Sequence, residues 1–305
     1  MMTEATSARA SAHAVAGAQR RRGGSYWLGT VWRIFVYLFT LVLGLMFMLP
    51  FFWALSSALK PVSELYLFPP LWFPRHWQPQ NFVTVWQLTP FAQWTWNSVK
   101  IAALNVVGEV LSAAAVAYGF SRFRFKGRNV LFVVLLSTMM IPIYVTIIPR
   151  FLLFKEFGWL DTHLPLIVPS FFGGGAFNIF LLRQFFMTIP QDFDEAAYVD
   201  GASSWTIFWK VILPLSKPAI STVAIFSFLF SWQAFLAPLI YLNTKGKFTL
   251  PIGLTWFNQP LMNSSEPRDH LLMAASVMVT LPVIALFFAA QRYFISGIVM
   301  SGLKG

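Results

Sequence analysis

Long runs of apolar residues constrain this chain more than any other feature of its sequence. A helix that crosses a bilayer needs about 20 mostly apolar residues, and six stretches meet this requirement, at residues 34–56, 98–121, 129–151, 164–186, 218–242 and 271–292. Only 11% of the residues are charged, whereas soluble domains carry about 25%. The sequence therefore predicts an all-α polytopic membrane protein with six transmembrane helices.

Basic residues around these stretches set the expected orientation. The connector RFRFKGR (residues 122–128) joins the second and third stretches, and Arg20, Arg21 and Arg22 precede the first. Lys and Arg collect on the cytoplasmic side of membrane proteins. Both termini are therefore expected in the cytoplasm, and the net charge of +11 reflects topology and not nucleic-acid binding.

Three segments are expected along the chain. These are a disordered cytoplasmic tail over residues 1–28, a six-helix membrane domain over 29–292 and a cytoplasmic C-terminal tail over 293–305. A cleaved signal peptide is the alternative for the N-terminus. It requires an apolar core of about 7–15 residues and a small-residue cleavage site, and the first apolar run is longer, which favours an uncleaved anchor.

The chain lacks the residue groups on which most enzymes and metalloproteins depend. It has no cysteine, its four histidines are scattered, and it contains neither paired carboxylates nor a Gly-x4-Gly-Lys-Ser/Thr phosphate loop. We therefore expect no catalytic residue, no metal site and no cofactor, and we expect ATP-derived energy to come from another subunit.

The connector over residues 187–217 is polar and has strong helix signals. Asp192 precedes Glu195 by three residues, which is the spacing of a capping box. Gly201 follows Asp200 at a position where a left-handed residue can end a helix. The face of this helix is expected to be flat, because it consists of Phe193, Ala196 and Ala197.

A second short helix is predicted directly after the first. Ser203 or Ser204 can cap its N-terminus, Pro214 ends it, and its apolar stripe consists of Trp205, Phe208, Trp209 and Ile212. The two helices carry a local acidic patch formed by Asp192, Asp194, Glu195 and Asp200. Since the inner leaflet is itself negative, we expect this pair to dock into a protein groove; a solvated loop is the alternative.

The stretch EAAYVDGASSWTIFWKVILPLSKP (residues 195–218) resembles the EAA loop of ABC-importer permeases. Glu195, Ala196, Ala197, Gly201 and Pro214 occupy the pattern, with one slight departure, since Leu213 directly follows the isoleucine before Pro214. The ending QRYFISGIVMSGLKG (residues 291–305) resembles the carbohydrate-importer branch, which includes one permease of the maltose importer. The resemblance covers nearly all of residues 30–305.

The resemblance implies a type I ABC-importer permease in the plasma (inner) membrane of a prokaryote. Its implied partners are membrane lipid, a second permease subunit that forms a heterodimer, two cytoplasmic ABC ATPase subunits and an extracytoplasmic solute-binding protein that delivers a sugar or oligosaccharide. The C-terminal tail is also implied to reach the ATPase. The residues implied to couple the permease to the ATPase are Glu195, Ala196, Ala197, Asp200, Gly201 and Pro214.

Polar residues inside the apolar stretches are candidates for the substrate pathway, namely Glu109, Asn178, Trp232 and Gln233. Ionisable groups at membrane depth are functional candidates by default. For Glu109 the alternatives are a hydrogen bond to a neighbouring helix or a proton relay in an ion-driven transporter. For Trp232 and Gln233 the alternative is helix packing. The glycines at 173–175 permit either close helix approach or local unwinding.

A Trp- and Pro-rich segment at residues 57–97 is expected outside the membrane. It offers either a sugar-stacking surface, an interfacial aromatic belt or an element that packs on a partner subunit. Its tryptophans are Trp72, Trp77, Trp86, Trp94 and Trp96. An integral-membrane enzyme is the remaining functional class, and it lacks support because no cluster of catalytic residue types occurs in the sequence.

Overall fold

The computed structural model describes the backbone of residues 2–258 and 267–302 and the side chains of residues 30–258 and 267–291. The chain divides into two compact units, Met1–Ser56 and Ser57–Gly305, and each unit is described by itself. Helices dominate both units, and the described residues contain no β-strand.

The first unit consists of helix α1 (Met2–Ala58), which extends two residues beyond the unit boundary. Its part at Thr30–Ala58 has a mean hydropathy of 2.4 and is long enough to cross a membrane, which confirms the first predicted span. The backbone of residues 2–28 is helical, in the segment 1–28 for which we predicted a disordered tail. The described side chains start at Thr30, so they do not test that prediction.

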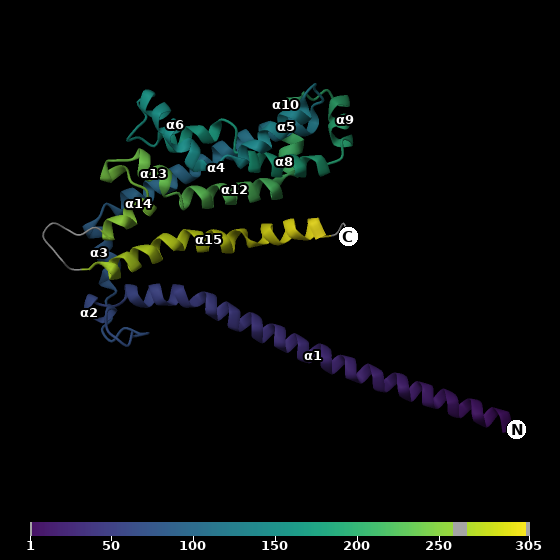
Figure 1. Cartoon of the computed structure of the whole chain (residues 1–305). Coiled ribbons are helices and arrows are strands. Elements are labelled where there is room, and N and C mark those ends of the chain that lie inside the picture. Colours follow the sequence, from purple (N-terminus) through teal and green to yellow (C-terminus); the bar gives the residue numbers. More distant parts are fainter. Residues whose placement is uncertain (1, 259–266, 303–305) are drawn as a thin grey trace. The chain divides into compact units, whose positions relative to one another are not determined.

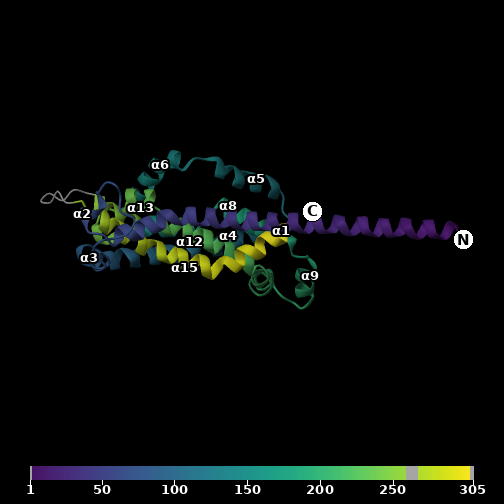
Figure 2. The ribbon, with the colours of Figure 1, turned by 90° about the horizontal axis from the view of Figure 1, so that it is seen from below.

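The second unit is built around the long helix α4 (Phe91–Arg122), which packs chiefly against α8 (Ala176–Thr188) and α12 (Lys217–Trp232). Helix α12 also packs against α15 (Asp269–Gly302), and the four helices run alongside one another (Figures 1 and 2). Phe91–Arg122 and Asp269–Gln291 are each long and apolar enough to span a membrane. The second and sixth predicted spans are therefore confirmed.

The third predicted span, residues 129–151, is not one straight helix. Helix α5 (Arg128–Ser137) continues into a 3-10 turn at Thr138–Met140, and α6 (Ile143–Glu156) follows at an angle of 96°. Pro142 lies in the break and has no N–H to donate, and it forces the preceding residue into the extended conformation seen at Ile141. The span is therefore bent in the middle.

The fifth predicted span, residues 218–242, is also interrupted. Helix α12 ends at Trp232, and α13 (Leu236–Tyr241) begins after an irregular turn. Pro238 has no N–H with which to bond the carbonyl group of Ala234 four residues earlier, so a continuous helix would lack that bond. On its other side, α12 meets the helical segment Ser204–Leu215 at 81°.

The fourth predicted span passes as one candidate at Leu164–Thr188, yet it unwinds in its middle. Helix α7 (Leu164–Ile167) and a 3-10 turn at Val168–Phe171 lead to Gly173, Gly174 and Gly175, which have φ values of 113°, 55° and 76° before α8 begins. A Cβ atom on Gly174 would lie 2.5 Å from the backbone nitrogen of Ala113 in α4. The glycines thus provide both of the features that we considered, unwinding and close approach.

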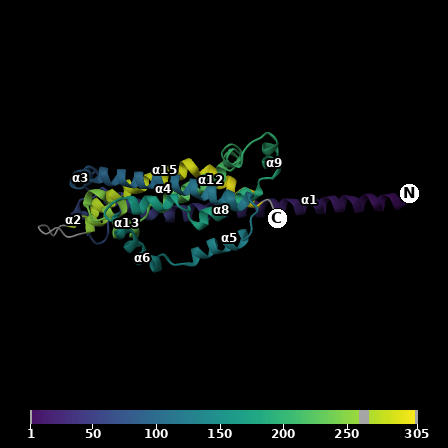
Figure 3. The same cartoon turned by 90° about the horizontal axis from the view of Figure 1, so that it is seen from above.

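The short elements lie at the two ends of this second unit. Helices α2 (Val62–Leu65), α3 (Gln80–Leu88), α13 and α14 (Leu250–Thr255) gather at one end, and α9 (Asp192–Val199) and α10 (Ser204–Ile207) lie at the other (Figure 1; Figure 3 shows α2, α3, α13 and α9 from above). Counting each bent pair as one span gives up to six membrane crossings among the described residues. The end of the second unit at which α9 lies then carries both polar connectors, residues 122–128 and 187–217.

The predicted C-terminal tail, residues 293–305, is continuous with α15 as far as Gly302. Residues 303–305 lie outside the described residues.

Candidate functional site

Helix α9 carries the EAA sequence and ends in a Schellman motif. Gly201 has a φ of +79°, its N–H donates to the carbonyl oxygen of Tyr198 at 3.0 Å, and the N–H of Ala202 donates to that of Ala197 at 2.9 Å. These two bonds satisfy carbonyl groups that the helix end would otherwise leave free. The predicted helix stop at Gly201 is confirmed, and it fixes the direction in which the chain leaves α9.

Helix α10 begins at a side-chain cap, as predicted. Ser203 is the N-cap residue, and its Oγ accepts the N–H of Thr206 at 3.2 Å. The hydroxyl groups of Tyr198 and Ser204 are 2.8 Å apart and join α9 to α10. Phe208–Ile212 continue α10 as a π-helix, and a short α11 (Leu213–Leu215) contains Pro214.

The N-terminus of α9 differs from the predicted capping box. The N-cap residue is Gln191, and neither its side chain nor that of Asp192 makes the expected cap bond. Helix α9 starts at Asp192 itself, because Asp194 and Glu195 donate their N–H groups to the carbonyl oxygen of Gln191. The predicted capping box is therefore absent, and the N-cap lies at Gln191, one residue before the predicted Asp192.

Most of the coupling candidates are exposed. Glu195, Ala196, Asp200, Gly201 and Pro214 are exposed, and Ala197 is half-buried against the core. Large apolar side chains are exposed beside them, with Val199 at 87% and others at Phe193, Tyr198, Trp205 and Trp209. Contiguous exposed apolar area on a soluble segment marks a surface that is covered by a partner. We call the exposed residues between Asp192 and Trp209 the α9–α10 surface; Pro214, in α11, lies outside it.

One member of the predicted acidic patch does not belong to that surface. Asp194 turns inward, and its Oδ2 atom lies 3.4 Å from Nη2 of Arg122, the last residue of α4. The Asp194 side chain is 12% exposed and that of Arg122 is 6% exposed. Burial raises the pKa of Asp194, and the neighbouring Arg122 guanidinium opposes this rise. Asp192, Glu195 and Asp200 remain as the exposed acidic residues.

Arg122 was missed as a functional residue because its sequence context has a second explanation. It lies in RFRFKGR, where we assigned the basic residues to topology alone. Its Nη1 atom also donates to the carbonyl oxygen of Ile189 at 3.1 Å, just before α9. Arg122 therefore holds both the entrance of α9 and its first turn against the end of α4.

The predicted apolar stripe of the second helix is divided between two environments. Phe208 and Ile212 are buried together with Ile207, whereas Trp205 and Trp209 are exposed. The π-helical turn at Phe208–Ile212 shifts the register of side chains that a regular helix would align. The sequence pattern therefore identified the apolar residues correctly and their common face incorrectly.

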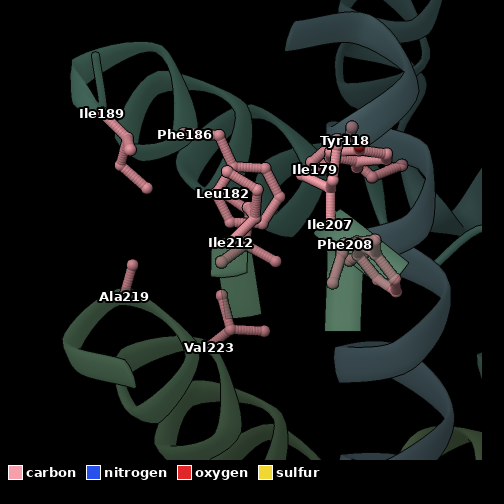
Figure 4. Packing of buried hydrophobic residues seen from close by; sticks show 13 residues of the cluster. Tyr118, Ile179, Leu182, Phe186, Ile189, Ile207, Phe208, Ile212, Ala219 and Val223 are labelled. Carbon is pink, nitrogen blue, oxygen red and sulfur yellow. The ribbon is translucent and has the colours of Figure 1, made fainter. Parts of the chain in front are cut away.

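The buried residues of α10 and its continuation form a core with the membrane helices (Figure 4). Ile207, Phe208 and Ile212 pack with residues of α4, α8 and α12, which include Tyr118, Leu182, Phe186 and Val223. The Tyr118 hydroxyl also donates to the carbonyl oxygen of Ser204 at 3.1 Å. Because interiors of this kind are close-packed, α10 and its continuation are held against three membrane helices.

A second polar group lies within the membrane helices and joins two of the predicted pathway residues. Asn178 of α8 donates its side-chain N–H to Glu109 Oε2 of α4 at 3.1 Å and to the carbonyl oxygen of Gly174 at 3.0 Å. Ser227 of α12 donates to the same Glu109 oxygen. Ser227 was missed, because a lone serine in an apolar helix carries no sequence signal.

The other two pathway candidates lie apart from this group. Trp232 is 2% exposed, stacks on Phe228, and donates its indole N–H to the carbonyl oxygen of Val279 at 3.1 Å. This placement favours helix packing for Trp232, the alternative stated above. Gln233 is exposed in the irregular turn after α12.

The tryptophans of the segment 57–97 are also divided. Trp94 is fully buried and donates its indole N–H to the carbonyl oxygen of Lys245 at 2.8 Å, so it is a core residue. The remaining four are exposed, namely Trp72, Trp77, Trp86 and Trp96.

A network of hydrogen bonds ties the loop before α7 to the loop after α13, at the end of the unit opposite α9. Asp161 Oδ1 accepts the backbone N–H groups of Asn243 and Thr244, and its Oδ2 pairs with Lys247 Nζ at 2.7 Å. Hydrogen bonds from Lys247 and Thr244 hold the pKa of Asp161 well below its usual range. This network gives the end opposite α9 a fixed loop structure.

The sequence of this chain is similar to a protein family and to individual proteins of known role. The family model of the binding-protein-dependent transport system inner membrane component matches residues 110–299. The chain is 35% identical to the arabinooligosaccharides transport system permease protein AraQ of Bacillus subtilis (strain 168), over 90% of this chain and 97% of that protein. It is 33% identical to the diacetylchitobiose uptake system permease protein NgcG of Streptomyces coelicolor, over 83% of this chain and 82% of that protein.

Solved structures give the same fold. A chain in the crystal structure of a bacterial ABC transporter involved in the import of the acidic polysaccharide alginate matches with a TM-score of 0.76 and 25% identity, covering 86% of this chain and 97% of that one. A chain of a bacterial alginate ABC transporter in complex with an alginate pentasaccharide-bound periplasmic protein matches with a TM-score of 0.62 at 15% identity. The second match supports the fold alone.

Proposed function

This chain belongs to the family of binding-protein-dependent transport system inner membrane components, and we propose that it is a permease subunit of an ATP-driven importer of an oligosaccharide. An extracytoplasmic binding protein delivers the substrate, a second permease completes the pathway, and two ABC ATPase subunits supply the energy. Relatives named for arabinooligosaccharides, diacetylchitobiose and galactooligosaccharides support the substrate class.

The observation that carries the proposal is the combination of an exposed EAA sequence with a rigid attachment to the membrane helices. Glu195 and Gly201 lie on the α9–α10 surface, whereas Asp194 of the same helix is paired with Arg122 of α4. A surface that binds an ATPase and is fixed to α4, α8 and α12 can transmit the movement of that ATPase to the pathway. A flexible loop would not transmit this movement.

The proposed orientation follows from the two connectors at one end of the second unit. The basic connector 122–128 and the α9–α10 surface lie at the same end, because Arg122 contacts Asp194. Assigning that end to the cytoplasm satisfies the positive-inside rule and exposes the α9–α10 surface to a cytoplasmic ATPase. Both termini are then cytoplasmic, and the C-terminal tail is on the ATPase side.

For the substrate pathway we propose Glu109, Asn178 and Gln233. Asn178 and Glu109 meet beside the unwound glycines, where backbone groups are available to a sugar hydroxyl. Trp232 is proposed to hold the end of α12 just before Gln233 by packing, since its indole is buried against α15.

Copurification with the ATPase tests the coupling proposal. The chain is co-expressed with candidate ATPase subunits and its partner permease, and Glu195→Lys and Gly201→Asp are compared with Glu156→Lys. Glu156 is an exposed residue at the C-terminus of α6, so its replacement is a matched charge reversal away from the α9–α10 surface. We expect only the first two changes to abolish copurification; equal recovery of all variants would contradict the proposal.

Ion-driven transport is the second candidate, and the carboxyl group of Glu109 at membrane depth is the observation that favours it. Uptake into proteoliposomes distinguishes ATP-driven import from ion-driven transport. Uptake that requires internal ATP and survives dissipation of the proton gradient supports the importer, whereas uptake that stops when the gradient is dissipated, with ATP still present, supports the ion-driven mechanism.

A further inference from the structure

We propose that the connector between α4 and α5 is a binding site for the phosphate headgroup of an anionic phospholipid, held by Arg124 and Arg128. The inference uses the cytoplasmic orientation proposed above, but it concerns a different surface and a different ligand. It starts from a cavity of about 480 Å³, whose lining residues are Arg124, Phe125, Gly127, Arg128, Asn129 and Val130.

The backbone of this connector is held in a defined turn. Gly127 has a φ of +83°, which lets the chain reverse between α4 and α5. The N–H of Leu131 donates to the carbonyl oxygen of Gly127 at 2.9 Å, and Nη1 of Arg128 donates to that of Phe123 at 3.2 Å. The Arg128 guanidinium is thus positioned across the turn and retains further donors for a ligand.

The positive charge of this region is not balanced within the described part of the chain. There, Arg122 is the only basic residue of the connector that forms an ion pair, and no carboxylate lies within 4.0 Å of the charged groups of Arg124, Lys126 or Arg128. Arg183 of α8 adds a further cation beside α5, since its guanidinium lies over the ring of Phe132 with 4.1 Å to the centroid. A bound anion would balance the charges of Arg124 and Arg128, and guanidinium groups match phosphate in geometry.

Apolar side chains next to these arginines indicate that the anion belongs to an amphipathic molecule. Phe123 and Phe125 are 43% and 44% exposed on the connector itself. Helix α5 continues from the cavity as the first part of the third predicted span, with Val130, Leu131, Val133 and Val134 exposed. The arginines at its start therefore lie at the level of the lipid headgroups, where a phospholipid can place its headgroup at the arginines and an acyl chain along α5.

The two polar connectors at this end of the unit are therefore suited to different partners. The α9–α10 surface exposes Asp192, Glu195 and Asp200 and is repelled by an anionic leaflet. The connector 123–128 exposes Arg124 and Lys126 and is attracted to it. Binding of the lipid to this connector leaves the acidic surface free for a protein.

Lipid binding to the purified chain, in complex with its partner subunits, tests this inference. Native mass spectrometry measures retention of dioleoylphosphatidylglycerol against dioleoylphosphatidylcholine, which have the same acyl chains. The variant Arg124→Gln/Arg128→Gln is compared with Arg150→Gln/Lys155→Gln, an equal loss of charge on exposed residues of α6. We expect the first pair to weaken phosphatidylglycerol binding by about thirtyfold, since each basic residue near an anionic surface contributes about fivefold, and the α6 pair to leave it unchanged.

Three results would overturn the proposal. They are equal retention of the two lipids by wild-type protein, equal phosphatidylglycerol binding by wild type and the Arg124→Gln/Arg128→Gln variant, or displacement of the lipid by inorganic phosphate at comparable concentration, which would indicate a site for soluble anions. If the double variant melts below wild type, Arg124→Gln alone carries the test, because Arg124 is exposed and removing it leaves the Arg128–Phe123 bond in place. Neither the double variant nor Arg124→Gln alone is expected to lose copurification with the ATPase. The lipid proposal can therefore be contradicted while the proposed function stands.

Discussion

Arg122 at the end of α4 and Asp194 in the first turn of α9 form an ion pair with 3.4 Å between Nη2 and Oδ2. Both side chains are largely buried, and Arg122 also donates to the carbonyl oxygen of Ile189. The pair fixes the exposed EAA helix to α4, the helix around which the second unit is built. If α9 docks an ATPase as proposed, this contact joins the docking surface to the membrane helices.

Removing one partner of this pair should be costly. Asp194→Asn leaves the buried Arg122 charge unbalanced, and we expect a loss of about 3 kcal/mol, which corresponds to a melting temperature lower by about 6–10 °C. Arg122→Gln should cost a similar amount. The double variant should cost less than the sum of the two, because each single change leaves the other charge unpaired. Thermal unfolding in detergent measures all three; additive effects would show that the two residues do not interact.

Replacing Gly201 tests whether a change at this position acts through backbone strain or through loss of contact with the ATPase. Gly201→Asn retains a residue that tolerates positive φ and places a side chain where no atom lies within 4 Å, so the fold should change little. Gly158→Asn is the matched control, since Gly158 has a φ of +65° with open space around it. We expect only Gly201→Asn to reduce ATPase copurification, by tenfold or more in apparent affinity, a loss of about 1.4 kcal/mol. Equal effects of both would point to backbone strain.

Close packing inside the membrane domain can be tested along α4. A Cβ atom on Gly108 would collide with Ser170 Oγ and lie 2.8 Å from the Phe171 ring, whereas nothing lies within 4 Å of one on Gly119. Gly108→Ala should therefore destabilise the protein by about 1–3 kcal/mol, and Gly119→Ala should be neutral or stabilise it by up to about 1 kcal/mol. Melting temperatures of the two variants decide this, and the opposite ranking would refute the packing observed at Gly108.

The stability of the end opposite α9 should depend on pH through Asp161. Hydrogen bonds from Lys247 and Thr244 hold the pKa of this carboxyl group below its ordinary value. An acid with a lowered pKa in the folded state stabilises the fold at pH values above its ordinary pKa, about 3.9, and this contribution is lost as the pH falls toward the folded-state pKa.

The variant Asp161→Asn provides the control for this pH effect. Its melting temperature should be lower than that of wild type at pH 7. The difference should shrink below about pH 4, where Asp161 of the unfolded wild-type chain begins to bind a proton while the folded carboxyl group is still ionised. Melting curves between pH 7 and pH 3 measure the difference. A constant difference across that range would show that Asp161 does not contribute through its charge.

Replacing Trp232 and Gln233 in turn distinguishes a residue that packs the helices from one that contacts the substrate. Trp232→Phe removes the indole hydrogen bond to Val279 and should lower the melting temperature by a few degrees with little change in the apparent KM for uptake. Gln233→Ala should leave the melting temperature unchanged, because Gln233 is exposed, and should raise the KM if this residue contacts the sugar. Uptake kinetics in proteoliposomes distinguish the two, and an unchanged KM for Gln233→Ala would remove it from the pathway.

The sequence by itself determined the class and the main elements. Residues 98–121 and 271–292 are apolar over lengths that only a membrane span requires, and Gly201 and Ser203 predicted a helix end and a helix start from local chemistry alone. These features depend on neighbouring residues, so no long-range contact is needed to predict them. The EAA pattern is likewise local, and it directed attention to the surface that the fold exposes.

Only the tertiary structure decided which polar residues meet. Arg122 and Asp194 are 72 residues apart in numbering yet form an ion pair, and Glu109, Asn178 and Ser227 come from three different helices. Pro142 and Pro238 are visible in the sequence, but whether the spans break near them was decided only by the tertiary structure, since membrane helices tolerate proline where neighbours bond the freed backbone groups. The contacts between segments remote in sequence depend on how helices pack, and that packing separates Asp194, which turns inward, from Glu195, which is exposed.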